Sequence, residues 1–132
     1  MTDYTAYFDE VIQAHVLIEQ WFAVEEDDAA LERLLTRFSP QFSMVSPLGR
    51  VLDLEALSAL FRMAGGQKSG FRIELSELRG IAVHERGATV SYREKQTDGT
   101  GLHSDRRSTV VFEKLESGPV VWRHLQETFC NS

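Results

Sequence analysis

Tyrosine, glutamate and glutamine alternate along one stretch of the chain, at Tyr92, Glu94 and Gln96. Residues two apart project from the same face of a β-strand, so a strand over 88–97 would present these side chains together, after an apolar Val90. The opposite face carries a solvated set, Ser91, Arg93, Lys95 and Thr97. A face that begins apolar and becomes polar is typical of a pocket wall, but a strand that emerges into solvent shows the same gradient.

A second polar set lies on the last predicted strand, over 119–129. Strict alternation places Trp122, His124 and Gln126 on one face of it. Both faces mix apolar and polar residues, so periodicity does not decide which face lines a pocket. A partner subunit against the outside of the sheet would also explain two half-apolar faces. The preceding strand has the same ambiguity and adds Arg106 as a polar candidate.

One histidine, His15, interrupts the apolar stripe of the first predicted helix, over 4–24. The stripe recurs at spacings of three and four through Tyr4, Phe8, Val11, His15, Ile18 and Phe22. A histidine in such a stripe is more often a core residue than a functional one. Its pKa would nevertheless suit acid/base work if the helix formed one wall of a pocket. His15, His124 and Glu94 are therefore the candidates for catalysis.

The same periodicity predicts two more helices, at 28–38 and 53–64. Pro40 prevents the first from continuing, because proline has no backbone N–H to donate. Asp53 can cap the start of the second, and the glycine pair at 65–66 can end it.

Alternation of apolar and polar residues predicts six strands. A hairpin lies between the second and third helices, and four strands follow from Phe71, the first with a bulge near Gly80. The expected bounds are 42–46, 50–52, 71–83, 88–97, 106–115 and 119–129. The order α-α-β-β-α-β-β-β-β predicts a single α+β domain over 1–132, with three helices covering one face of the sheet.

Composition and charge restrict the possible functions. The 132 residues carry a net charge of −6, and the basic residues are scattered, which argues against nucleic acid as a partner. No apolar run approaches the ~18 residues of a membrane span, and the N-terminus does not resemble a signal peptide. We therefore expect no membrane partner and a cytoplasmic location. The histidines lack metal-ligand spacing, and no phosphate-binding loop is present, so we expect no metal and no cofactor.

Three spaced motifs, together with the element order, point to a family. They are Tyr92-x-Glu94-x-Gln96, Arg106-x-Ser108-Thr109-x-x-Phe112 and Trp122-x-His124-x-x-Glu127-Thr128. They resemble the SnoaL-like branch of the nuclear transport factor 2-like superfamily, and within it small bacterial single-domain members of unassigned function. The resemblance covers nearly the whole chain. It implies a cone in which a strongly curved antiparallel or mixed sheet wraps three helices, usually as a homodimer through the outer face of the sheet.

The resemblance implies a cavity in the cone but selects no reaction, because relatives are isomerases, dehydratases, cyclases, epoxide hydrolases or binding modules. His124 and Gln126 match positions where several relatives have a His-x-His pair. Ketosteroid-isomerase-like members have a carboxylate base on the first hairpin, where this chain has Ser43, Val45 and Ser46.

We therefore expect a domain that binds a small molecule in a pocket between helices and sheet. Two alternatives stay open: an acid/base enzyme acting on a small carbonyl or hydroxylated ring compound, and a homodimeric interaction module without a ligand. The predicted ligand contacts are Tyr92, Glu94, Gln96, Arg106, Trp122, His124, Gln126 and His15.

Overall fold

The computed structural model describes residues 3–24 and 26–130, and within them the predicted order of helices and strands is confirmed. The elements are α1 (Thr5–Ala23), α2 (Asp28–Leu35), β1 (Phe38–Val45), β2 (Val51–Asp53), α3 (Leu54–Ala64), β3 (Arg72–His84), β4 (Gly87–Asp98), β5 (Gly101–Lys114) and β6 (Val120–Phe129).

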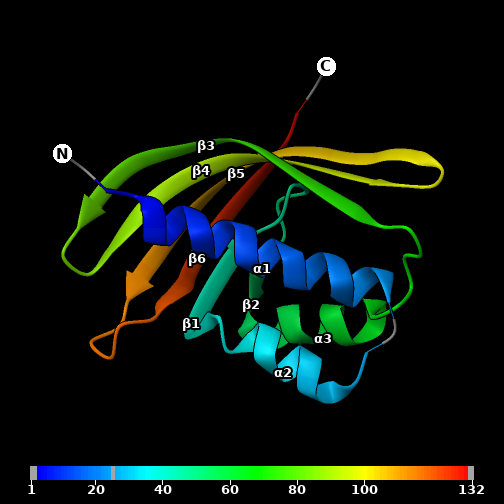
Figure 1. Ribbon diagram of the computed structural model, residues 1–132, viewed down its shortest axis with the longest axis horizontal. Helices are drawn as coiled ribbons and strands as arrows, with labels where there is room; N and C mark the ends of the chain where they lie inside the picture. The colour runs from blue at the N-terminus through cyan, green and yellow to red at the C-terminus, as the bar shows by residue number, and fades with distance from the viewer. Residues whose placement is uncertain (1–2, 25, 131–132) are drawn as a thin grey trace.

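The strands form one mixed sheet in the order β2-β1-β6-β5-β4-β3. Only the β1–β6 pair among them is parallel, because β1 and β6 are far apart in the chain whereas the other neighbours follow short turns. The long strands β3 to β5 arch over α1, and the helices lie on one side of the sheet (Figure 1). The fold is therefore the predicted α+β cone.

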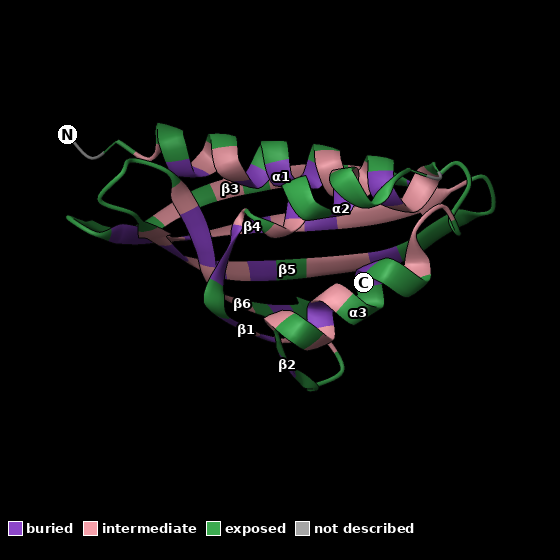
Figure 2. Cartoon of the chain, turned by 90° about the horizontal axis from the view of Figure 1, so that it is seen from below, coloured by how far each residue is buried: buried purple, intermediate pink, exposed green. Residues whose placement is uncertain are grey.

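Helix α1 turns one face towards the strands. Its buried residues include Val11, Ala14 and His15, and they lie on the side facing the sheet, whereas the opposite side is exposed (Figure 2). Val11 and His15 of the predicted stripe are buried, and its other four residues are partly buried against the core. The packed face also includes Tyr7, Ala14 and Trp21, which the stripe left out.

The second helix is shorter than predicted, because α2 ends at Leu35 and Phe38 already belongs to β1. The backbone N–H of Trp122 in β6 donates a hydrogen bond to the backbone carbonyl of Arg37 at 2.9 Å. The residues that follow α2 are therefore paired with the sheet and do not continue the helix. Pro40 lies within β1 and not beyond a helix end. The β1–β6 register shifts between Phe38 and Ser43, so no ladder hydrogen bond is required at the proline.

The turn between β1 and β2 and the helix α3 agree with the predictions made from the sequence. Gly49 N–H donates to Ser46 O at 2.9 Å and closes the β1–β2 turn, with Gly49 at a φ of 84°. The Asp53 carboxylate accepts a hydrogen bond from Ala56 N–H at 2.9 Å and caps α3, which ends just before Gly65. The predicted bulge near Gly80 is also confirmed by a register shift in the β3–β4 pair.

Strand β6 departs from strict alternation, and this corrects the predicted faces. The β5–β6 ladder pairs Phe112 with Trp122 but Val111 with His124, so Arg123 is an extra residue in a β-bulge. Beyond the bulge the side chains change faces. The prediction that Trp122, His124 and Gln126 share one face is therefore wrong.

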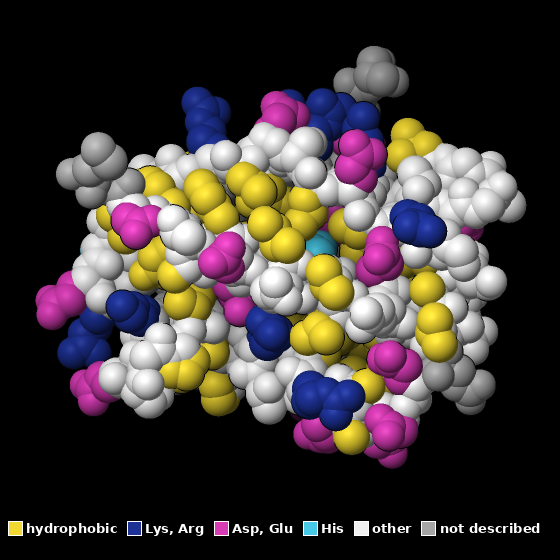
Figure 3. Space-filling view, viewed as in Figure 1, with side chains coloured by type: hydrophobic (Ala, Val, Ile, Leu, Met, Phe, Trp, Pro, Cys, Tyr) yellow, Lys and Arg dark blue, Asp and Glu magenta, His cyan; other side chains and the backbone are white. Residues whose placement is uncertain are grey.

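The surface over the helices carries no continuous basic patch. Lys and Arg side chains lie apart from one another there, with Asp and Glu between them, and hydrophobic side chains form a band across the middle (Figure 3). No helix among the described residues has both the length and the apolar character needed to cross a membrane.

Candidate functional site

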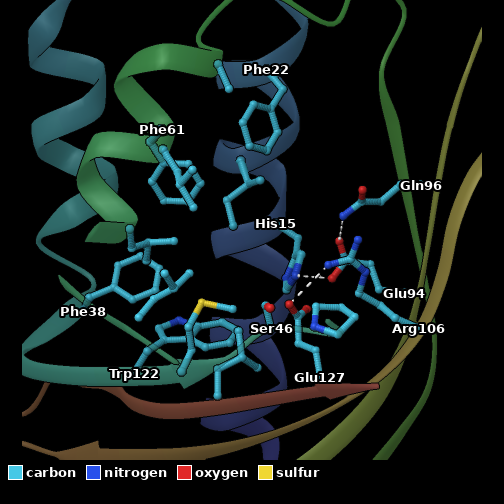
Figure 4. Close-up of a pocket in the computed structure, with 18 of the residues that line it drawn as sticks. His15, Phe22, Phe38, Ser46, Phe61, Glu94, Gln96, Arg106, Trp122 and Glu127 are labelled. Atoms are coloured by element: carbon cyan, nitrogen blue, oxygen red, sulfur yellow. Dashed lines mark hydrogen bonds and ion pairs between the residues drawn. The ribbon is translucent and has the colours of Figure 1, made fainter. Parts of the chain in front are cut away.

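A cavity of about 340 Å³ lies between the helices and the concave face of the sheet. Its walls are mostly aromatic and aliphatic, and both lining carboxylates lie at one end with His15 and Arg106. Phe22, Phe38 and Phe61 lie on the opposite side of the cavity from Glu94, Arg106 and Glu127 (Figure 4). An apolar cavity of this size with a few polar groups at one end is typical of small-molecule sites.

His15 and Glu94 form a buried pair at the polar end. His15 Nε2 lies 3.1 Å from Glu94 Oε1, and His15 Nδ1 lies 2.7 Å from the Val11 carbonyl oxygen. A carbonyl can only accept a hydrogen bond, so the Nδ1–H donates to it. The proton between Nε2 and the carboxylate therefore decides whether the pair is imidazolium and carboxylate or neutral imidazole and carboxylic acid.

The ion-pair form is favoured. Burial by itself disfavours both charges, but the His15 charge and hydrogen bond, with further help from Gln96 and Arg106, lower the pKa of Glu94 to about 2. Burial likewise opposes the imidazolium, yet Glu94 and the Val11 carbonyl raise the pKa of His15 above its ordinary 6.5. Gln96 Nε2 donates to the second Glu94 oxygen at 2.7 Å, so both carboxylate oxygens of Glu94 have a hydrogen-bond partner.

Arg106 and Glu127 form the second pair, on β5 and β6. Arg106 Nη1 donates to Glu127 Oε1 at 3.2 Å, while Arg106 Nε donates to Ser104 Oγ at 2.8 Å. Ser108 Oγ donates to the other Glu127 oxygen at 3.4 Å. Burial raises the pKa of Glu127 above its ordinary 4.5, against the opposing effect of Arg106, and the Glu94 charge raises it further. The two carboxylates in this cavity thus have pKa values shifted in opposite directions.

Tyr92 places an unpartnered hydroxyl in this polar setting. The side chain is 2% exposed, and its hydroxyl oxygen has no hydrogen-bond partner among the described residues. Burial, with the nearby Glu94 and Glu127 charges, raises the pKa of Tyr92 well above 10.0 against the opposing effects of Ser108 and Arg106, so the hydroxyl keeps its proton. The ring packs edge-on against His15 and Trp122, with centroid distances of 5.3 and 6.5 Å.

Six of the eight predicted contacts line the cavity: His15, Tyr92, Glu94, Gln96, Arg106 and Trp122. The other two, His124 and Gln126, lie beyond the β6 bulge on the outer face of the sheet. There His124 Nδ1 lies 2.7 Å from Ser43 Oγ, and Gln126 pairs across the ladder with Thr109.

Glu127 is a lining residue that strict alternation separates from Trp122. Alternation grouped it with the face opposite to Trp122, whereas the bulge brings both residues to the cavity. The available signal was the spacing of the apolar residues. Trp122 and Leu125 are separated by an odd number of positions, so only a bulge between them lets both pack inward.

Comparison with solved structures finds chains that are similar to this one in shape, including one that is also similar in sequence. An NTF-2-like protein of unknown function from Pseudomonas aeruginosa is 48% identical, with a TM-score of 0.90 over 96% of this chain and 99% of that one. A ketosteroid isomerase-like protein from Erwinia carotovora atroseptica has a TM-score of 0.68 at 9% identity, covering 100% of both chains.

A hub homology domain of CaMKII type from Chlamydomonas reinhardtii has a TM-score of 0.76 at 16% identity, covering 98% of this chain and 100% of that one. The similarities at 9% and 16% identity show a shared fold alone. No protein-family model matches the sequence, and no curated protein is similar enough to it to count as a match.

Proposed function

This chain belongs to the nuclear transport factor 2-like superfamily, and we propose that it binds a small, mostly apolar molecule that presents one uncharged oxygen atom to the polar end of the cavity. The observation that carries this proposal is the buried Tyr92 hydroxyl, which lacks a partner among the described residues and belongs to a side chain that lines the cavity. Buried polar groups are nearly always hydrogen-bonded, so an unpartnered donor in a cavity supports a ligand acceptor there.

The charges at the polar end support an uncharged oxygen rather than an anion. His15 lies against Glu94, and Arg106 lies against Glu127, so each cation already has a carboxylate partner. A carboxylate brought into the same buried region would lose its hydration and compete with these partners. A carbonyl or hydroxyl oxygen can accept the Tyr92 hydrogen bond without disturbing either pair.

The remaining walls support a flat apolar body for the ligand. The Trp122 ring is buried and packs edge-on against Phe112 at 4.9 Å, and Phe38 packs against Phe42 at the same distance. These rigid rings offer a large apolar surface at little conformational cost.

Replacing Tyr92 by phenylalanine tests the proposal. For the wild type we expect 2-acetylnaphthalene to bind about fivefold more tightly than 2-ethylnaphthalene, since one hydrogen bond contributes about 1 kcal/mol. In Tyr92→Phe we expect this preference to disappear. Since the hydroxyl has no hydrogen-bond partner within residues 3–24 and 26–130, the variant should remain as stable as the wild type. Quenching of tryptophan fluorescence measures both affinities.

The matched control is Gln126→Ala on the outer face, which should keep the preference for the ketone. A Tyr92→Phe protein that still discriminates between the two compounds would contradict the proposal, as would a wild type that binds neither.

The opposed pKa shifts of Glu94 and Glu127 favour a second candidate function, proton transfer on a carbonyl or hydroxylated ring compound. Carboxylates whose pKa values are pushed apart in one site commonly serve as base and acid. Protonated Glu127 and the Tyr92 hydroxyl would donate to the ligand oxygen. The His15–Glu94 pair would accept a proton from the carbon next to the carbonyl, giving an enol.

Exchange of the methyl protons of 2-acetylnaphthalene in deuterium oxide, followed by NMR, tests this candidate. We expect the wild type to accelerate exchange over buffer, and Glu94→Gln and Glu127→Gln each to lower that rate by about 10²–10⁴-fold. An exchange rate equal to that of buffer, with the ketone shown to be bound, would leave binding as the function.

A homodimer through the outer face of the sheet stays a prediction. The helices lie on the other side of the sheet (Figure 1), and the chain shares its fold with a hub homology domain. Light scattering should give twice the chain mass of 15.0 kDa, and a mass of one chain would contradict the dimer.

A further inference from the structure

Lys68 lies at the mouth of the cavity. Among the lining residues, Leu60 and Lys68 are exposed, so the cavity reaches the surface beside them. The segment after α3 is attached to the end of α1: Gly66 N–H donates to Trp21 O, and Lys68 N–H donates to Phe22 O, each at 2.9 Å. The backbone at Lys68 is therefore held in place.

The ammonium group of Lys68 is held over aromatic rings. Its Nζ lies 4.7 Å from the centroid of Phe22 and 5.1 Å from that of Phe71, and these rings pack edge-on at 5.4 Å. A cation over aromatic faces is attracted to them but keeps its N–H groups available. Within residues 3–24 and 26–130, Lys68 makes no ion pair, so this charge has no carboxylate partner there.

The charges along the cavity are therefore asymmetric. Both lining carboxylates, Glu94 and Glu127, lie at the polar end, where His15 and Arg106 neutralise them. Phe22, which Lys68 covers, is on the far side of the cavity from Glu127 (Figure 4). The charges of the cavity interior are thus balanced in pairs, whereas Lys68 at the mouth has no carboxylate partner among the described residues.

We propose that Lys68 selects ligands that carry an acidic group at the end opposite to the uncharged oxygen. The inference rests on the proposed function and names the class of ligand, an apolar keto or hydroxy acid bound with its carboxylate at the mouth. The carboxylate keeps part of its hydration there, so it avoids the desolvation cost that excludes an anion from the interior.

Three probes with one ring system test this assignment: 2-acetylnaphthalene, 6-acetyl-2-naphthoic acid and 6-acetyl-2-naphthamide. The amide matches the acid in shape but has no charge. In the wild type we expect the acid to bind about three- to fivefold more tightly than the amide, which is the contribution to affinity expected of a partly exposed ion pair. Salt screens this attraction, so the ratio of the two affinities should be smaller at high salt. In Lys68→Gln the ratio should fall to about one, and in Lys68→Glu the acid should bind more weakly than the amide.

Lys114→Gln serves as the control, because this exposed lysine at the end of β5 lies away from the cavity lining and should keep the wild-type ratio. An acid preference that persists in Lys68→Gln would place the carboxylate at Arg106 and overturn the assignment. Equal affinity of acid and amide in the wild type would also overturn it, while binding of the neutral ketone would leave the proposed function standing. Failure of the ketone to bind would contradict the proposed function and this inference with it.

Discussion

Replacing His15 by leucine is expected to lower the free energy of unfolding by about 3–5 kcal/mol at about pH 5.5, between the ordinary pKa values of glutamate and histidine. The substitution removes the cation that lies 3.1 Å from Glu94 and leaves a carboxylate that is 3% exposed. Gln96 still donates one hydrogen bond to it, but an amide does not neutralise its charge. Urea denaturation followed by circular dichroism measures the loss.

The pH dependence of this loss follows from the two pKa shifts. The pKa of Glu94 is lowered to about 2 from an ordinary 4.5, so its contribution is complete above pH 4.5 and is lost as the pH falls towards 2. The pKa of His15 is raised above 6.5, so its contribution is complete below pH 6.5 and is lost as the pH rises through the raised value. The difference between wild type and His15→Leu should therefore be largest between pH 4.5 and 6.5.

The double variant His15→Leu with Glu94→Leu shows whether the loss of stability comes from the broken ion pair or from altered packing of the side chains. Because it removes both charges, we expect it to be more stable than His15→Leu alone, and near the wild type. A double variant that is less stable than the single one, or a loss that does not change with pH, would contradict the ion-pair form of the two residues.

Aspartate at position 125 should destabilise the protein far more than aspartate at position 126. Leu125 follows the β6 bulge, lines the cavity and packs against the hydrophobic core, so Leu125→Asp places an unpaired charge against apolar side chains and should cost about 3 kcal/mol or more. Gln126 is exposed on the outer face, so Gln126→Asp should change the free energy of unfolding by no more than about 0.5 kcal/mol.

Strict alternation predicts the opposite ranking, because it puts Gln126 on the face of Trp122. Thermal and urea denaturation of both variants therefore test the bulge directly. Equal losses, or a larger loss for Gln126→Asp, would show that Arg123 is not the extra residue.

Local patterns in the sequence determined most of the architecture. Helix α1 and the inward position of Val11 and His15 follow from apolar spacing alone. Asp53 marks the start of α3 because a capping carboxylate acts within one turn. The alternation along β4 is regular, so it correctly assigned Tyr92, Glu94 and Gln96 to one face, and the structure places all three in the cavity wall.

Only the tertiary structure decided how the polar end is assembled. A single extra residue, Arg123, exchanges the faces of β6 and brings Glu127 rather than His124 and Gln126 into the cavity, and a period of two cannot reveal this without its partner strand. The pairing of His15 with Glu94, 79 positions apart, likewise depends on how the sheet curves over α1. The unpartnered Tyr92 hydroxyl is a property of the whole site, because a missing hydrogen bond depends on every neighbour at once.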